Sequence, residues 1–268
     1  RVLFRSDEWI KSRTGIVTRY YAKEEKTFEL AKDAAKEALE RAGVLPEDIS
    51  LCITATITGD YATPSTSCMV QRELGLPENI PVFDINAACS GFIYALSVAD
   101  RMLNEGEYGL VIGCERLSKI LDFTDRSTCV LFGDGAGAAI VKKEKNGEFY
   151  FSLGASGNKD ALYAGGINEK DAFVHMNGAQ VFRFATGAME KGIKEMKKMS
   201  GYDDIDMYVC HQANARIIAH VQKRLDIPAE KIFMNLQKYG NTSGASIPIA
   251  LDELFEQGKV KEGDRIIA

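Results

Sequence analysis

Apolar side chains recur at helical spacing, with charged residues between them, over two long segments at 28–42 and 182–199. A short run typical of a buried strand follows each segment, at 47–54 in the first half of the chain and at 203–210 in the second. The two runs are similar, because each begins with two acidic residues and then becomes apolar. Helix followed by strand therefore occurs twice.

A second pair of similar stretches, 70–77 and 221–228, ends a further predicted helix in each half. Strands that alternate with helices in this way pair in parallel, with the helices as crossover connections. The alternative is a chance likeness between two βαβ units. We predict a layered α/β fold of two duplicated halves, residues 1–145 and 146–268, which meet near the charged stretch 142–147.

In open α/β sheets, functional sites gather at the carboxyl ends of the strands, so the two halves should present these ends to a shared crevice. The first half offers Cys89, between a predicted strand at 81–85 and an almost wholly apolar helix at 91–103. A thiol at a helix N-terminus faces the positive end of the helix dipole and unpaired N–H groups, which favour the thiolate. We therefore expect a lowered pKa and a nucleophilic role for Cys89, whereas the usual buried cysteine is a small apolar residue.

The second half offers a histidine and an asparagine. His211 ends the predicted strand that repeats one beside the Cys89 loop, and Asn241 lies in a glycine-flanked turn. Taken singly, a histidine is more often a core residue, and such a turn is more often only a turn. Together, Cys, His and Asn are used by papain-like proteases and in acyl transfer to a thioester. The papain-type sequence around the nucleophile is absent, so we favour acyl transfer.

Composition excludes several other classes. The 268 residues have a formal charge of −5 and are 46% hydrophobic, which is ordinary globular composition and disfavours nucleic-acid binding. No run of about 18 uncharged apolar residues could span a bilayer, and the N-terminal stretch lacks the apolar core of a signal peptide. The six cysteines include no CxxC pair, so neither a zinc site nor a disulfide framework is indicated. We expect a cytoplasmic protein that binds no membrane, no nucleic acid and no metal.

Five motifs make the prediction specific. In the order SDEWI-x-x-RTGI, AACSGF, FGDGAGAA, HQAN and GNTS, the sequence resembles the β-ketoacyl-acyl-carrier-protein synthase III family, of the thiolase fold. The resemblance extends from about Ser6 to the last residue and implies a thiolase-like α/β/α/β/α architecture. The family also has a strand before SDEWI and a glycine-rich segment after the final strand, so we expect both ends of this chain to be incomplete.

The resemblance implies a role for each matching residue. Cys89 would be the acylated nucleophile, and His211 and Asn241 would promote malonyl decarboxylation and stabilise the resulting enolate. The residues that would contact coenzyme A are Trp9, Arg13, Arg126 and Asn214. The implied reaction initiates fatty acid synthesis: an acyl-coenzyme A primer and malonyl-acyl carrier protein give β-ketoacyl-acyl carrier protein, coenzyme A and CO2. Two N–H donors at one point can stabilise the enolate, so no cofactor is expected beyond the coenzyme A thioester substrate.

Two alternatives stay open. A related Cys–His–Asn enzyme that makes a polyketide or quinolone precursor would have the same residues. A non-catalytic acyl-binding protein is the second alternative, although the presence of all three polar groups argues against it.

Basic residues on two predicted helices of the second half are candidates for docking an acidic acyl carrier protein: Arg183, Arg216 and Lys223. An ordinary solvated face would look the same. The resemblance also implies a homodimer in which Thr63, just before Pro64, reaches the partner's acyl pocket. Some members have a bulky Phe at this position, so the smaller Thr predicts room for primers of four or five carbons.

Residues 132–141 superficially resemble a dinucleotide-binding fingerprint. Their glycines are spaced G-x-G-x-G and are followed by strand-like AAIV rather than by a helix. We therefore predict that these small residues serve packing.

Overall fold

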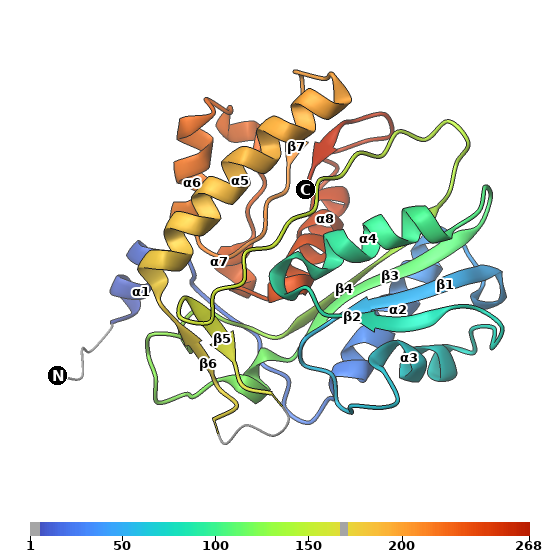
Figure 1. Cartoon of the computed structure of the whole chain (residues 1–268), viewed down its shortest axis with the longest axis horizontal. Coiled ribbons are helices and arrows are strands. Elements are labelled where there is room, and N and C mark those ends of the chain that lie inside the picture. Colours follow the sequence, from blue (N-terminus) through green and yellow to red (C-terminus); the bar gives the residue numbers. More distant parts are fainter. Residues whose placement is uncertain (1–5, 167–170) are drawn as a thin grey trace.

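The computed structural model describes residues 6–166 and 171–268, in which helices cover both faces of a four-stranded sheet (Figure 1). The α-helices are α1 (Asp7–Thr14), α2 (Thr27–Ala42), α3 (Thr66–Leu74), α4 (Gly91–Met102), α5 (Gly178–Ser200), α6 (Ala215–Arg224), α7 (Leu236–Tyr239) and α8 (Ser246–Glu256). The 3-10 helices are η1 (Pro46–Asp48), η2 (Ala88–Ser90), η3 (Leu117–Ile120), η4 (Ala229–Lys231) and η5 (Ser243–Ala245). The strands are β1 (Ile49–Ala55), β2 (Val82–Ile85), β3 (Tyr108–Glu115), β4 (Gly135–Lys142), β5 (Leu162–Ala164), β6 (Val174–Met176), β7 (Met207–Tyr208) and β8 (Ile266–Ile267).

The four-stranded sheet has the order β2-β1-β3-β4, with β1 parallel to both of its neighbours and β4 antiparallel to β3. Parallel neighbours need crossover connections, and α3 and α4 provide them. The carboxyl ends of β1, β2 and β3 therefore meet at one edge. The strand predicted from AAIV is β4. A Cβ on Gly137 would lie 2.8 Å from the backbone nitrogen of Ile249, so the predicted packing role is confirmed by the close approach of α8.

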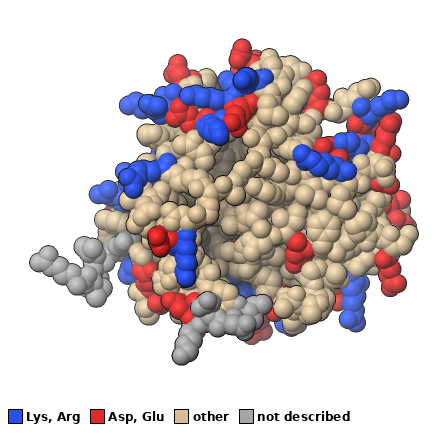
Figure 2. All heavy atoms as spheres, viewed as in Figure 1, with Lys and Arg blue, Asp and Glu red and all other residues tan. Residues whose placement is uncertain are grey.

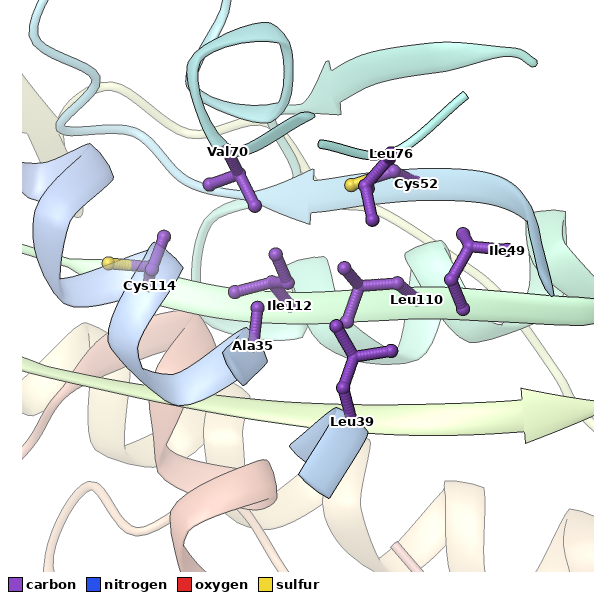
Figure 3. Close-up of a cluster of buried hydrophobic side chains, with 10 residues drawn as sticks. Ala35, Leu39, Ile49, Cys52, Val70, Leu76, Leu110, Ile112 and Cys114 are labelled. Atoms are coloured by element: carbon purple, nitrogen blue, oxygen red, sulfur yellow. The ribbon is translucent and has the colours of Figure 1, made fainter. Parts of the chain in front are cut away.

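One face of the sheet is covered by α2 and α3. Ala31, Ala35 and Leu39 recur every four residues along α2 and belong to one buried cluster with the alternate residues Leu110 and Ile112 of β3. Figure 3 shows Ala35 and Leu39 beside Leu110 and Ile112. Burying a side chain the size of Leu or Ile stabilises the fold by roughly 1.5–3 kcal/mol. This cluster fixes α2 against β1 and β3.

The opposite face is covered by α4 and α8. Phe92 and Ala95 of α4 pack with Val111 of β3 and Ile247 of α8. The other side of α8 contributes Ala250 and Leu254 to a separate cluster with residues of the second half. Beyond that half's strands lie α5 and α6, so helices and strands alternate in five layers (Figure 1). The predicted α/β/α/β/α architecture is confirmed.

The strands of the second half repeat the arrangement around β1. Just as β1 lies between β2 and β3, Tyr208 of β7 pairs in parallel with Ile232 on one side and with β8 on the other. The duplication inferred from residues 47–54 and 203–210 therefore corresponds to equivalent central strands. These strands are shorter than expected, because β7 has only two residues. The boundary between residues 145 and 146 stays a prediction.

Within the described residues, no helix has the length and apolar character needed to cross a membrane. All six cysteines, which lie in the described part of the chain, are free thiols.

Candidate active site

Cys89 lies where β2 leaves the sheet and α4 begins. It is the middle residue of η2, one residue before Ser90, the N-cap of α4. Ala88, just before it, has φ +47°, in the left-handed region that residues with a side chain rarely adopt. The backbone therefore makes a sharp, strained turn at Cys89, which places the residue at the carboxyl edge of the sheet.

The expectation of a lowered thiol pKa is wrong. Burial raises the pKa of Cys89 above its ordinary value, although hydrogen bonds from Ser243 and from its own backbone amide act in the opposite direction. The residue is partly buried, and desolvation of the thiolate outweighs these donors. In the structure the thiol is therefore the stable form, and forming the thiolate requires proton removal.

Asn241 is buried and held through its backbone. Its N–H donates to Leu131 O at 2.9 Å, and its carbonyl oxygen accepts from Gly133 N at 3.0 Å. Its side-chain oxygen accepts a hydrogen bond of 2.8 Å from the backbone N–H of Ser243. Because the amide oxygen is occupied in this way, the NH2 group is oriented as a donor.

His211 follows β7 and contacts the start of α8. Its Nδ1 lies 2.6 Å from the hydroxyl oxygen of Ser246, which also accepts a bond of 3.3 Å from the backbone N–H of Gln212. Burial lowers the pKa of His211 to about 4. The imidazole is therefore neutral near pH 7 and can donate through one nitrogen only.

One segment, residues 241–246, joins the three predicted residues. It begins with Asn241, packs through η5 against the η2 turn of Cys89, and ends at Ser246, the partner of His211. The structure thus gathers the three residues around adjoining elements of both halves, at the carboxyl ends of β1–β3, as predicted from the duplication.

Glu115 is a residue of this region that the sequence analysis missed. The side chain is fully buried at the last position of β3, and it accepts hydrogen bonds from the backbone N–H of Ile57 at 3.2 Å and from the Thr58 hydroxyl at 2.6 Å. Burial raises the pKa of Glu115 to about 8. The sequence does contain a signal for Glu115, because a charged residue ends an apolar strand at the edge of the sheet where the site lies.

Three of the predicted coenzyme A residues lie on two helices that touch. Trp9 and Arg13 are exposed on α1, with the guanidinium carbon of Arg13 6.0 Å from the Trp9 ring centroid. Asn214 caps α6, because its side chain accepts from the backbone N–H of Arg216 at 2.9 Å. Contacts between α1 and α6 bring Trp9 and Arg13 to the same side of the molecule as Asn214. Arg126 is exposed in the segment between η3 and β4.

The predicted carrier-protein residues lie on α5 and α6, which pack side by side (Figure 1). Arg183, Arg216 and Lys223 are exposed and make no ion pair with the described residues. By contrast, Lys194 and Arg224 both contact Glu190, at 2.6 Å and 3.5 Å. Figure 2 shows basic and acidic side chains mixed along the top of this face, over α5. Some basic residues of α5 and α6 are thus neutralised by an acidic residue of the same two helices.

Thr63 is exposed in the loop between β1 and α3, immediately before Pro64. Its role in primer choice stays a prediction.

Sequence comparison matches residues 83–157 to the family described as 3-oxoacyl-[acyl-carrier-protein] synthase III and residues 197–268 to the C-terminal part of the same family. A β-ketoacyl-[acyl-carrier-protein] synthase III from Clostridium perfringens is 48% identical over 98% of this chain and 86% of the relative. The chain belongs to the synthase III family. It is a condensing enzyme of the acyltransferase type, as the motifs predicted.

Solved structures agree with this assignment. A synthase III from Aquifex aeolicus superposes with a TM-score of 0.92 at 46% identity, covering 97% of this chain and 85% of that one. The Thermus thermophilus enzyme gives a TM-score of 0.90 at 40% identity, with the same coverage. The synthase III family and the thiolase-like fold are therefore both confirmed.

Proposed function

We propose that this synthase III joins an acyl-coenzyme A primer to malonyl-acyl carrier protein through an acyl-enzyme on Cys89. The observation that supports this most is the segment 241–246, which links Asn241 and the partner of His211 to the Cys89 turn. Such an arrangement provides a nucleophile and two polar groups in one buried place, which is what a decarboxylative condensation needs.

In the first half-reaction, the sulfur of Cys89 attacks the thioester carbonyl of the primer. The carbon–sulfur bond to coenzyme A breaks, and coenzyme A leaves with the proton that Cys89 gives up. Because burial favours the thiol, this proton must be removed as the bond forms. The departing sulfur of coenzyme A is the acceptor of this proton, and His211 stays neutral because burial lowers its pKa to about 4.

In the second half-reaction, malonyl thioester loses CO2 and negative charge develops on its thioester oxygen. The amide NH2 of Asn241 and the Nε2–H of His211 are the proposed donors to this oxygen. The resulting carbanion attacks the acyl group on Cys89, and the sulfur leaves and regains a proton. These steps use only side chains and the substrates' own thioesters, so we propose that no further cofactor takes part.

The proposed partners and the proposed assembly are those that the family resemblance implies. We propose that Trp9, Arg13, Arg126 and Asn214 bind coenzyme A, and that the unpaired cations of α5 and α6 bind the acidic carrier protein. A cytoplasmic homodimer is proposed as the working form.

The test is intact-protein mass spectrometry after incubation with acyl-coenzyme A, followed by measurement of CO2 released from labelled malonyl-acyl carrier protein. We expect one acyl adduct per chain on wild-type protein and none on Cys89→Ala, with Cys129→Ala as a matched control at another partly buried cysteine. Binding of the primer with no adduct and no CO2 would support an acyl-binding protein instead. An acyl adduct on Cys89 that is condensed with an acceptor other than malonyl-acyl carrier protein would support an enzyme that makes a polyketide or quinolone precursor.

A further inference from the structure

Glu115 connects parts of the site that are distant in sequence. Its carboxyl accepts from Ile57 and Thr58 after β1, and also from the hydroxyls of Thr56 at 3.3 Å and Ser243 at 3.4 Å. Ser243 belongs to η5 in the second half, so one buried side chain bridges the end of β1, the end of β3 and the GNTSG turn. The Glu115 side chain has no exposed surface, and its polar partners show that it joins these segments by hydrogen bonds and not by apolar packing.

The backbone around this bridge is packed closely. A Cβ on Gly113 would collide with the carbonyl oxygen of Gly244, so β3 meets η5 with no room for a side chain. A Cβ on Gly244 would lie 3.3 Å from the carbonyl oxygen of Ala88. Ser243 itself has φ +49°, a strained conformation that the surrounding contacts must maintain. A change at Glu115 is therefore transmitted directly to the turns of Asn241 and Cys89.

The charges near Glu115 are unusual for a carboxyl group. Its oxygens receive hydrogen bonds from hydroxyls and one amide, and no Lys or Arg forms an ion pair with it within residues 6–166 and 171–268. The thiols of Cys89 on η2 and of Cys114 on its own strand interact with it, and the charges of Asp60, Lys119 and Asp134 also reach Cys114. A negative charge at this position would therefore oppose a thiolate at Cys89, with no cation of the described residues paired to the Glu115 carboxylate.

We propose that Glu115 is a positioning residue which, as a neutral carboxylic acid, holds Ser243 and the Asn241 turn against Cys89 and whose ionisation suppresses the Cys89 thiolate. This inference rests on the proposed roles of Cys89 and Asn241. The raised pKa of Glu115, about 8, agrees with a neutral form at neutral pH. A negative charge on Cys89 raises the pKa of Glu115, and because repulsion between two charges is mutual, an ionised Glu115 at higher pH would oppose the thiolate.

The electrostatic part is tested by the pH dependence of Cys89 alkylation with iodoacetamide, read from the Cys89 peptide by mass spectrometry. Glu115→Gln keeps the shape and polar contacts but cannot ionise, so we expect the alkylation midpoint to fall by about one pH unit. The matched control is Asp84→Asn, a part-buried carboxyl that accepts from Thr66 N and Ser67 N at the start of α3. The control should keep the wild-type midpoint, even where its melting temperature falls. A midpoint in Glu115→Gln that equals or exceeds that of wild type would overturn the proposal.

The positioning part is tested with Glu115→Ala and Ser243→Ala in steady-state assays of CO2 release. Both remove the bridge, and we expect each to lower kcat at least tenfold while the KM for primer changes less than threefold. Unchanged kcat in both variants would refute this part. Should Glu115→Ala fail to fold, Ser243→Ala still decides it. Should the wild type release no CO2, the proposed function fails, while the alkylation profile still tests the link between Glu115 and Cys89.

Discussion

The imidazole of His211 and the hydroxyl of Ser246 lie 2.6 Å apart, and this contact determines what the histidine can do. The backbone N–H of Gln212 already donates to the Ser246 oxygen, which leaves the hydroxyl proton available for Nδ1 of His211. With Nδ1 as an acceptor, the ring proton resides on Nε2. We therefore expect the first residue of α8 to favour the tautomer that can donate to a thioester oxygen.

Ser246→Ala should therefore impair decarboxylation more than acylation. Loss of one buried hydrogen bond of about 1–1.5 kcal/mol corresponds to roughly a tenfold fall in the rate of CO2 release. Acylation of Cys89, followed by intact mass, should change by less. Ser246→Thr keeps the hydroxyl and serves as the control, and equal losses in both half-reactions would argue against tautomer selection.

The depressed pKa of His211 makes stability depend on pH. The unfolded chain binds a proton near pH 6.5, whereas the folded protein does so only near pH 4, so acid favours unfolding between these values. Above pH 6.5 the neutral His211 costs the folded protein no stability. As the pH falls from 6.5 to 4, the free energy of unfolding decreases by up to about 3 kcal/mol because the unfolded chain gains the proton first. Urea unfolding at pH 7 and pH 4.5 should show a smaller loss for His211→Gln than for wild type. His220→Gln, exposed on α6, should behave as wild type does.

The sequence predicted the layers and the positions of Cys89, His211 and Asn241, because periodicity and strand ends are local properties. It did not predict the sign of the Cys89 pKa shift. The helix-terminus argument was local, whereas the desolvation that outweighs it comes from the surrounding packed chain. Burial of this kind is visible only after both halves are assembled.

Glu115, Ser243 and Ser246 were missed for a related reason. Ser243 lies in the GNTS motif and Glu115 ends an apolar strand, but each of the three residues acquires its importance from a contact with a residue far along the chain, such as the Glu115–Ser243 bond. The short strands of the second half show the same limit. Residues 207–210 have a strand pattern, but β7 is assigned to only two of them.

His211→Ala and Asn241→Ala should separate the two half-reactions. Both donors are proposed to act on the malonyl thioester, so CO2 release should fall by about a hundredfold or more in each variant. Primer-dependent labelling of Cys89 should persist in both variants better than CO2 release does. Quench-flow labelling measures the first step and radiolabelled CO2 the second. A parallel collapse of both steps in Asn241→Ala would show that the division of roles is wrong.

Arg216→Glu should weaken use of the carrier protein selectively. Arg216 is exposed, forms no ion pair with the described residues and lies in the first turn of the helix that Asn214 caps, with its guanidinium carbon 5.9 Å from the Phe182 ring centroid, so its charge is available to an anionic partner. We expect the KM for malonyl-acyl carrier protein to rise about fivefold or more, with a smaller effect at high salt. Arg224→Glu makes the same charge change on the same helix, at a residue already paired with Glu190, and is the control. Equal effects of the two variants would indicate a general charge effect.

Thr63 concerns primer choice. The side chain is exposed in the single chain. The family resemblance implies that this loop reaches the partner's acyl pocket in the proposed dimer. A threonine leaves volume that a phenylalanine would fill, and each additional buried methylene of a primer contributes roughly 0.8 kcal/mol. We therefore expect isobutyryl-coenzyme A and other primers of four or five carbons to compete at least equally with acetyl-coenzyme A. Thr63→Phe should shift the preference toward acetyl, whereas Thr63→Ser should not. Competition kinetics with both primers in one reaction measure the ratio directly, and a strong acetyl preference in wild type that Thr63→Phe leaves unchanged would mean that other side chains close the pocket.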